Sequence, residues 1–309
     1  MNFFKPKFWD RNKISFFSIL LFPIALLISL LSFFRYYFTK THEFSVPIIC
    51  VGNIYLGGTG KTPLCNEIFL ILKKLNMNPA FIRKKYYDQI DEVNLQKKVG
   101  PVFQNKKRTK AIKEAINNKA DIVILDDGFQ DYSIKKKISI ICFNEKQWIG
   151  NNLLIPAGPL RESLSALKRA DCVVINGNKN INYENKILAK NKKIKIFYSK
   201  YEPKNLDKFL NKKITAFAGI GNPENFFNLL ENNKIDIAEK IKFQDHYAYS
   251  EKDLDLLVSK SNQQNSILLT TEKDYLRIND YYKKKINYLK VELKIENNEN
   301  FIKQLKNII

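Results

Sequence analysis

Cysteine and histidine are scarce in this chain of 309 residues, which has four cysteines and two histidines. The cysteines lie at positions 50, 65, 142 and 172, form no C-x-x-C pair, and sit mostly in apolar runs. This spacing argues against a zinc site or a disulfide framework and predicts buried free thiols in a reducing compartment. The only imidazole groups are those of His42 and His246.

Arginine is also rare, although the chain is strongly basic. Lys and Arg total 52 against 31 Asp and Glu, a formal net charge of +21, but arginine occurs only at positions 11, 35, 83, 108, 161, 169 and 277. Such a surplus suits nucleic acid, an anionic membrane or acidic substrates, and lysine drift over solvated faces explains it equally well. Because no nucleic-acid-binding motif accompanies the charge, we expect no nucleic-acid partner.

Charged side chains are absent from residues 14–34, which read ISFFSILLFPIALLISLLSFF. A helix of this length can cross a bilayer. Both flanks are basic, and Tyr36 and Tyr37 add the aromatic edge typical of a membrane interface. A signal peptide and a buried core helix are the alternatives, but the run is long for a signal and no small-residue cleavage site follows it. We expect a membrane-anchoring helix in residues 1–40, and its depth in the bilayer stays open.

Glycine is concentrated in the stretch 46–64, VPIICVGNIYLGGTGKTPL. An apolar, β-branched run precedes a glycine loop that ends in Gly60-Lys61-Thr62, and apolar residues at helical spacing follow. Strand, glycine loop, Gly-Lys-Thr and helix in this order predict a phosphate-binding P-loop. The departure from the strict pattern is Tyr55, which stands where the first glycine is expected. A glycine turn that happens to precede a lysine is the alternative.

The residue types in this loop suit a nucleotide. Glycines let backbone N–H groups converge on phosphate oxygens, and the helix N-terminus adds positive potential. Lys61 can pair with the β- and γ-phosphates, and the Thr62 hydroxyl can ligate Mg²⁺. The expected ATP- and phosphate-binding residues are Gly57, Gly58, Thr59, Gly60, Lys61 and Thr62.

Apolar runs alternate with helical patterns along the rest of the chain, which predicts an α/β fold with a doubly wound, P-loop NTPase-like sheet. Strands are expected at 80–83, 101–103, 121–127, 138–143, 172–176, 214–218, 267–271 and 286–291, with one edge strand near 194–198 inside a connector at 177–212. Helices are expected at 108–118 and 223–230. The expected domains are a P-loop domain at 41–212 and a second, smaller α/β domain at 213–309.

Acidic residues follow one of these strands in the run DIVILDDGFQ, residues 121–130. The run resembles a Walker B strand, in which Asp126 or Asp127 would hold Mg²⁺ directly or through water. A simple strand-to-turn boundary is the alternative.

Three further features could carry chemistry. Asp91-Glu92 is either a helix start or an acidic pair at a site. His246 follows Asp245 and is either a structural histidine or part of a base that takes a hydroxyl proton. Arg161-Glu162 ends the rigid loop PAGPLRE, where Arg161 could pair with phosphate or form an exposed ion pair with its neighbour.

Several stretches together resemble one family, the tetraacyldisaccharide 4'-kinases, which are the lipid A kinases of Gram-negative bacteria. The matching stretches, in the family's order, are VGNIYLGGTGKTP, DEVNLQKKVGPV with Arg108, DDGFQ, GNNLLIPAGPLRE, ADCVVING, FQDHYAYSEKDL and TTEKD. They cover residues 46–274.

The resemblance implies a membrane-associated enzyme that transfers the γ-phosphate of ATP, with Mg²⁺, to the 4'-hydroxyl of a lipid A disaccharide 1-phosphate. It implies work at the cytoplasmic face of the bacterial inner membrane, on a membrane lipid surface. Asp91, with His246 as its partner, and Lys61 take catalytic positions, and Thr62, Asp126 and Asp127 take the metal position. The positions near the phosphates and the lipid head group are Arg83, Glu92, Arg108, Arg161 and Glu162.

The chain departs from the family's pattern between residues 82 and 93. The loop after the second strand reads Ile82-Arg83-Lys84-Lys85-Tyr86-Tyr87 instead of continuing into Ser-Arg-Gly-Tyr-Gly, and the insert after it is short. Ile90 and Val93 replace the Gly and Pro that flank the acidic pair, and Asp131 stands where a His is usual. These changes put the roles of Arg83 and Tyr86 in question.

Two other classes of function use a similar P-loop. A membrane-bound ATPase switch would hydrolyse ATP without a lipid acceptor, and the PAGPLRE loop with Asp91 and His246 argues against it. A kinase for a soluble metabolite would have no use for the apolar N-terminus. Protein partners and acyl-chain specificity are not readable from the sequence.

Overall fold

A computed structural model describes residues 6–10, 14–86 and 90–307 of the chain. Contacts divide the chain into two units. The P-loop unit comprises Met1–Lys85, Val99–Lys200 and Lys294–Ile309, and the second unit comprises Tyr86–Lys98 and Tyr201–Leu293. The sequence-based domain limits of 41–212 and 213–309 differ from these bounds at 86–98, 201–212 and 294–309, which group with the other unit by their contacts.

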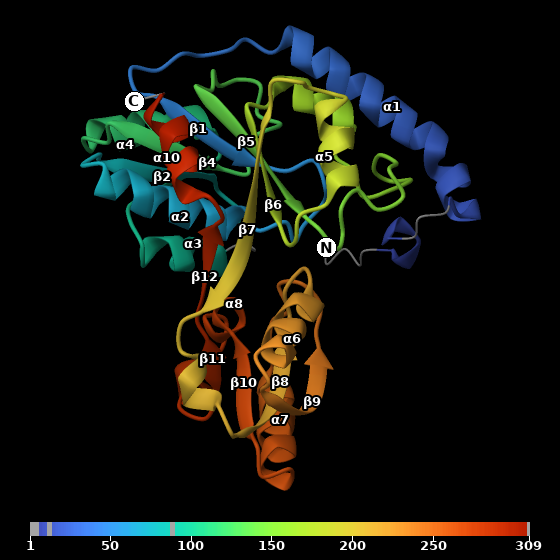
Figure 1. Cartoon of the computed structure of the whole chain (residues 1–309), viewed down its shortest axis with the longest axis vertical. Coiled ribbons are helices and arrows are strands. Elements are labelled where there is room, and N and C mark those ends of the chain that lie inside the picture. Colours follow the sequence, from blue (N-terminus) through green and yellow to red (C-terminus); the bar gives the residue numbers. More distant parts are fainter. Residues whose placement is uncertain (1–5, 11–13, 87–89, 308–309) are drawn as a thin grey trace. The chain divides into compact units, whose positions relative to one another are not determined.

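An eight-stranded sheet, in the order β12-β7-β6-β5-β1-β4-β2-β3, forms the framework of the P-loop unit (Figure 1). Its strands are β1 (Ile48–Gly52), β2 (Pro79–Lys84), β3 (Val102–Asn105), β4 (Ile122–Asp126), β5 (Ile138–Asn144), β6 (Cys172–Asn176), β7 (Lys195–Pro203) and β12 (Val291–Ile295). The helices of this unit are η1 (Lys7–Asp10), α1 (Phe16–Phe38), α2 (Lys61–Lys74), α4 (Arg108–Asn117), η2 (Leu164–Arg169), α5 (Ile181–Leu188) and α10 (Asn298–Lys306).

The register of this sheet positions the expected site. Neighbouring strands from β3 through β7 pair in parallel, and β1 lies between β4 and β5. Val51 of β1 pairs with Asp126 of β4. The P-loop and the acids at the end of β4 therefore lie at the same edge of the sheet, where ligand sites of such folds form.

Helices cover both faces of the eight-stranded sheet, which makes it doubly wound as expected. Ile48 and Cys50 of β1 belong to one buried cluster with Ile112 of α4. On the other face, the Phe81 ring of β2 stacks on Phe69 of α2 at a centroid distance of 4.7 Å. The central strands β1, β4, β5 and β6 are buried at every position, as parallel strands between helix layers must be.

The second unit contains its own parallel sheet, in the order β11-β10-β8-β9. Its elements are α3 (Ile90–Lys97), η3 (Leu206–Phe209), β8 (Lys213–Ala218), α6 (Pro223–Asn232), β9 (Asp236–Lys242), α7 (Glu251–Gln263), β10 (Ile267–Thr271), α8 (Glu272–Tyr275), α9 (Asp280–Lys283) and β11 (Asn287–Leu289). Ala216 of β8 packs in a cluster with Phe227 of α6, and Phe217 packs in another with Leu254 of α7. Successive residues of β8 thus face different helices, and the unit is a smaller α/β lobe, as expected.

Most predicted elements are confirmed, and three expectations were wrong. The connector at 177–212 contains the helix α5, and its strand β7 is not an edge strand because β12 pairs with it. Tyr198 accepts a hydrogen bond from the Glu296 N–H, whereas Lys204, later in the chain, donates its N–H to the earlier Lys290 O. Residue numbers thus rise along β7 as they fall along β12, so this pair is antiparallel. The single strand expected at 286–291 is divided between β11 and β12.

All four cysteines are buried free thiols, as predicted.

Helix α1 is long and apolar enough to cross a membrane. Along this fully described helix the buried residues are Ser18 and Ala25, whereas Phe16 is 74% and Leu26 is 62% exposed. A soluble core helix buries its apolar face. The exposure of α1 therefore contradicts the alternative that it is a core helix.

The core of the P-loop unit allows a test of the fold. Ile141 of β5 is fully buried, whereas Ile181 at the start of α5 is 60% exposed. Ile141→Ala should lower the free energy of unfolding by about 2–5 kcal/mol because it removes buried methyl groups and leaves a cavity. Ile181→Ala, the same chemical change at an exposed position, should cost less than about 1 kcal/mol. Denaturant unfolding in detergent measures both, and equal losses would contradict this placement of β5.

Candidate active site in two clusters

The P-loop follows β1 and leads into α2 through backbone conformations that favour glycine. Gly57 and Gly60 have φ angles of 80° and 88°, and Gly60 is the N-cap residue of α2. Side chains are strained in this left-handed region, which glycine enters freely. Lys61 and Thr62 occupy the first turn of α2, so the helix N-terminus and both side chains face the same end of the helix.

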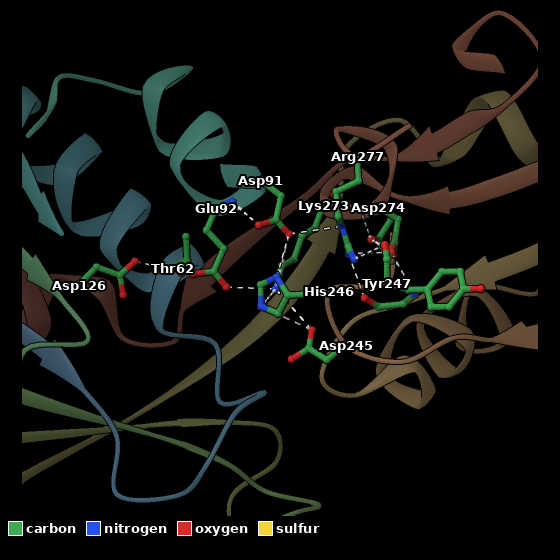
Figure 2. A network of polar contacts seen from close by, with 12 residues as sticks. Thr62, Asp91, Glu92, Asp126, Asp245, His246, Tyr247, Lys273, Asp274 and Arg277 are labelled. Carbon is green, nitrogen blue, oxygen red and sulfur yellow. Dashed lines mark hydrogen bonds and ion pairs between the residues drawn. The ribbon is translucent and has the colours of Figure 1, made fainter. Parts of the chain in front are cut away.

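Two acids at the end of β4, Asp126 and Asp127, hold the reactive side chains of this loop. The Thr62 hydroxyl donates a hydrogen bond to Asp126 Oδ2 at 3.0 Å, drawn in Figure 2. Arg83 Nη1 pairs with the same oxygen at 2.5 Å, and both of these residues are buried. Arg83 therefore contacts the expected metal-site carboxylate in this structure.

Asp127 pairs with Lys61 and with Arg161. Lys61 Nζ is 3.5 Å and Arg161 Nη1 is 2.8 Å from Asp127 Oδ1. Burial alone would raise the pKa of Asp127, but the positive charges of Lys61 and Arg161 outweigh it and hold this pKa well below its usual range. Asp127 is therefore an anion that keeps both cations at the P-loop.

Arg108 and Glu162 lie in the same unit and join the remaining sequence motifs to this cluster. Arg108 donates to the backbone oxygen of Asp127 at 2.7 Å and pairs with Asp131 at 3.2 Å. The acid that replaces the family's usual His thus contacts an expected phosphate-site arginine. Glu162 accepts hydrogen bonds from Gln130, Tyr132 and Arg169. Arg161 and Glu162 bind different partners, so the alternative of an ion pair between them is wrong.

One residue that supports the loop was not singled out from the sequence. The Asn53 side chain, which is fully buried, donates a hydrogen bond to the Thr59 hydroxyl at 3.0 Å. Gln130 of the DDGFQ run donates to the backbone oxygen of Asn53 at 2.9 Å. The hydrogen bond from Asn53 to Thr59 thereby joins the two ends of the glycine loop. The sequence feature that could have indicated Asn53 is its place directly after a buried strand.

The second cluster lies within the second unit and is centred on Asp91, in the first turn of α3 (Figure 2). Its side chain is 1% exposed, and its Oδ2 atom is 3.4 Å from His246 Nδ1. The structure therefore brings together two residues that the sequence could relate only through a family resemblance. His246 adopts a φ of 58°, and its backbone N–H donates to Gly219 O at 3.2 Å.

Two cations from the TTEKD region join this pair. Lys273 Nζ lies 3.0 Å from Glu92 Oε1 and 3.3 Å from His246 Nε2. Arg277 Nε lies 3.4 Å from Asp91 Oδ2. Burial raises the pKa of Asp91, but the hydrogen bond from His246 and the charges of Lys273 and Arg277 outweigh burial and lower it. Asp91 is thus a carboxylate at neutral pH. Lys273 belongs to the TTEKD stretch and Arg277 follows it, and neither position predicts from sequence a contact with Asp91.

Asp274 anchors this cluster and is fully buried. It accepts hydrogen bonds from Arg277, Tyr249 and the Gly219 backbone at 2.8–3.0 Å. Its other oxygen accepts from Thr271, the N-cap residue of α8. Since Arg277 and Gly219 contact Asp91 and His246 respectively, Asp274 fixes the supports of the reactive pair.

Removing this anchor should destabilise the protein. Asp274→Ala leaves the Arg277 cation and several buried donors without their acceptor, so we expect a loss of about 3–5 kcal/mol in the free energy of unfolding. The matched control is Asp280→Ala, whose carboxylate is 95% exposed and pairs with Lys283. It should cost less than about 1 kcal/mol. Unfolding in denaturant measures both variants, and a small loss for Asp274→Ala would contradict its anchoring function.

Comparisons with known proteins identify the family of this chain. The family model for tetraacyldisaccharide-1-P 4'-kinase matches residues 17–309. The chain is 42% identical to a tetraacyldisaccharide 4'-kinase of Pelagibacter ubique, over 97% of this chain and 96% of that relative. It is 34% identical to one of Rickettsia bellii, over 89% of each chain.

A solved structure has the same fold over nearly the whole chain. It is the crystal structure of LpxK from Aquifex aeolicus in complex with ATP, with a TM-score of 0.73 and 25% identity. The match covers 94% of this chain and 99% of that one. With a P-loop, an acidic pair on the adjacent strand and matches over nearly its full length, this chain belongs to the tetraacyldisaccharide 4'-kinase family, the ATP-dependent kinases of lipid A biosynthesis.

Proposed function

We propose that Lys61 and Thr62 bind the phosphates of ATP in this chain and that Asp91 takes the proton of the 4'-hydroxyl of tetraacyldisaccharide 1-phosphate. The observation that carries the nucleotide half is the pairing of Val51 with Asp126, which brings the P-loop to the acids at the end of β4. The hydroxyl of Thr62 and the carboxylate of Asp126 already contact each other there.

The P-loop unit supplies positive charge next to the phosphoryl group, on which negative charge develops during transfer. Lys61 lies opposite Asp127 and can exchange this partner for phosphate oxygens when a nucleotide enters. Oxygen ligands such as those of Thr62, Asp126 and Asp127 are the type that Mg²⁺ prefers, and it binds with few protein ligands when phosphates complete its shell. We assign these three residues to Mg²⁺, which would neutralise phosphate charge when bound. Arg83 would stay on Asp126 and orient it.

The second unit supplies the base. Asp91 is an anion whose one oxygen accepts the Glu92 backbone N–H at 2.9 Å, while the other faces His246 and Arg277. During transfer the hydroxyl O–H bond breaks and its proton moves to Asp91. The hydroxyl oxygen forms a bond to the γ-phosphorus, and the bond to ADP breaks. Positioning and electrostatics account for most of the rate of such a step.

The other expected residues support the anionic groups. Arg108 and Arg161 hold Asp127 and would pair with phosphate oxygens, because guanidinium groups bind phosphate in a bidentate manner. Glu92 and Glu162 act by holding cations, Lys273 and Arg169 respectively. Neither glutamate needs to touch the transferred group.

The exposed helix α1 and the basic surplus fit an enzyme that works at an anionic lipid surface. We place the protein at the inner membrane, and on its cytoplasmic face because ATP is available there. A lipid substrate with four acyl chains resides in the membrane, which gives an anchored kinase direct access to it.

The decisive assay is phosphate transfer by the full-length protein in detergent. With ATP, Mg²⁺ and tetraacyldisaccharide 1-phosphate, we expect a bis-phosphorylated lipid and ADP in equal amounts. ATP hydrolysis that does not depend on the lipid would instead indicate an ATPase switch. Activity on a soluble acceptor without detergent would indicate a metabolite kinase.

Lys61→Ala should reduce transfer by at least about 10³-fold, since the lysine neutralises the transferring group. The matched control is Lys74→Ala, at the exposed C-terminal end of the same helix, which should keep wild-type activity. Both variants should unfold at about the wild-type temperature. Near-normal turnover by Lys61→Ala would contradict the P-loop assignment.

Asp91→Asn should lower kcat by about 10²–10⁴-fold, the range typical of a lost general base, and change the KM for ATP little. Asp236→Asn, at an exposed position of the same unit, is the control and should leave both constants unchanged. Steady-state kinetics with both substrates varied separates the effects. An effect confined to KM would be incompatible with a base.

A further inference from the structure

Lys273 is the cation on which the polar groups around the base converge. Its Nζ atom lies 3.0 Å from Glu92 Oε1, 3.6 Å from Asp245 Oδ1 and 3.9 Å from Asp91 Oδ2. The same atom lies 3.3 Å from Nε2 of the His246 ring, and Figure 2 shows this arrangement. All of these residues belong to the second unit.

The charge state of Lys273 determines the direction of its bond to the imidazole. Burial lowers the pKa of Lys273, but Glu92, Asp245 and Asp91 outweigh burial and raise it, so the side chain is an ammonium. An ammonium group donates hydrogen bonds and accepts none. Where Nζ meets Nε2, the ring nitrogen must therefore be the acceptor and carries no proton.

The proton of the neutral ring must then be on Nδ1, which faces Asp91 Oδ2 at 3.4 Å. The competing arrangement would place the proton on Nε2, toward the Asp245 carboxylate. Asp245 Oδ1 is 3.8 Å from Nε2, beyond hydrogen-bond distance and farther than the ammonium. An imidazolium would point an N–H at the ammonium, so that two donors and two positive charges would face each other. The contacts around the ring thus favour a single tautomer.

We propose that Lys273 is a positioning residue that holds His246 in the neutral Nδ1–H tautomer, so that the imidazole N–H faces the Asp91 carboxylate. The effect on catalysis rests on the proposed function of Asp91 as the base, whereas the tautomer does not. In this form His246 orients the carboxylate and cannot accept its proton at Nδ1. The proton taken from the hydroxyl therefore stays on Asp91 during transfer.

The scarcity of histidine makes the tautomer directly measurable. In full-length protein labelled with ¹⁵N-histidine in detergent, only His42 and His246 contribute ring signals. Protonated and unprotonated ring nitrogens resonate far apart, and coupling to the ring carbon-bound protons tells Nδ1 from Nε2. We expect His246 to show a protonated Nδ1 and an unprotonated Nε2 at neutral pH. A protonated Nε2 in the wild type overturns the proposal without any variant.

The variants separate positioning from structure. Lys273→Met removes the donor and should move the proton at least partly to Nε2, the position it prefers in free histidine, while the His42 signals stay unchanged. Lys273→Arg keeps a cationic donor and should retain the Nδ1–H form. Asp245→Asn is the matched control and should also retain it. An unchanged tautomer in folded Lys273→Met, or a changed one in Asp245→Asn, contradicts the proposal.

Kinetics then tests the consequence. Lys273→Met should lower kcat by more than about 10-fold, but by no more than Asp91→Asn, because it weakens the base without removing it. The KM for ATP should stay within about 2-fold, and Lys273→Arg should restore most of kcat. If the tautomer shifts and kcat does not fall, the link to catalysis is wrong. If Asp91→Asn is also fully active, the proposed base fails while the tautomer assignment stands.

Discussion

Buried carboxylates need cations, and this requirement shapes both clusters. Asp126, Asp91 and Asp274 are nearly inaccessible, and each contacts an arginine. An unpaired charge at such a site costs several kcal/mol, whereas a guanidinium with fixed geometry and weak hydration compensates it. The few arginines of a lysine-rich chain accordingly include the partners of these acids, and lysine covers solvated surface.

The same pairing prepares the site for its chemistry. Asp127 keeps Lys61 and Arg161 beside the P-loop, where we propose that phosphate binds. In the second unit, Lys273 and Arg277 keep Asp91 ionised, and His246 faces it. Electrostatic groups held in advance need no reorganisation during the reaction, which is the main advantage of a protein site over water. Asp274 fixes Arg277 to the core of the second unit, because it also accepts hydrogen bonds from Tyr249 and Gly219.

Local patterns predicted most of the buried strands but failed where pairing partners lie far along the chain. β9 was missed because its residues alternate with charges and it is only partly buried at the edge of its sheet. β7 was wrongly expected at an edge, since its partner β12 lies far away in the sequence, near the C-terminus. Strand order depends on these long-range contacts, and no window of sequence contains both partners. The bounds of the two units depend on them in the same way, since Tyr86–Lys98 groups with residues after 200.

The sequence by itself determined the P-loop, the acids of DDGFQ and the family, because each is carried by contiguous residues whose local conformation follows from their types. It also marked Asp91, Glu92 and His246 as candidates, although only the resemblance paired Asp91 with His246. Only the tertiary structure decided what surrounds them. Lys273 reaches Glu92 across 181 positions of sequence, and Arg83 turns to Asp126. Such contacts arise from packing of separate elements, and charge pairing in a dry interior selects them, so composition and spacing could not have revealed them.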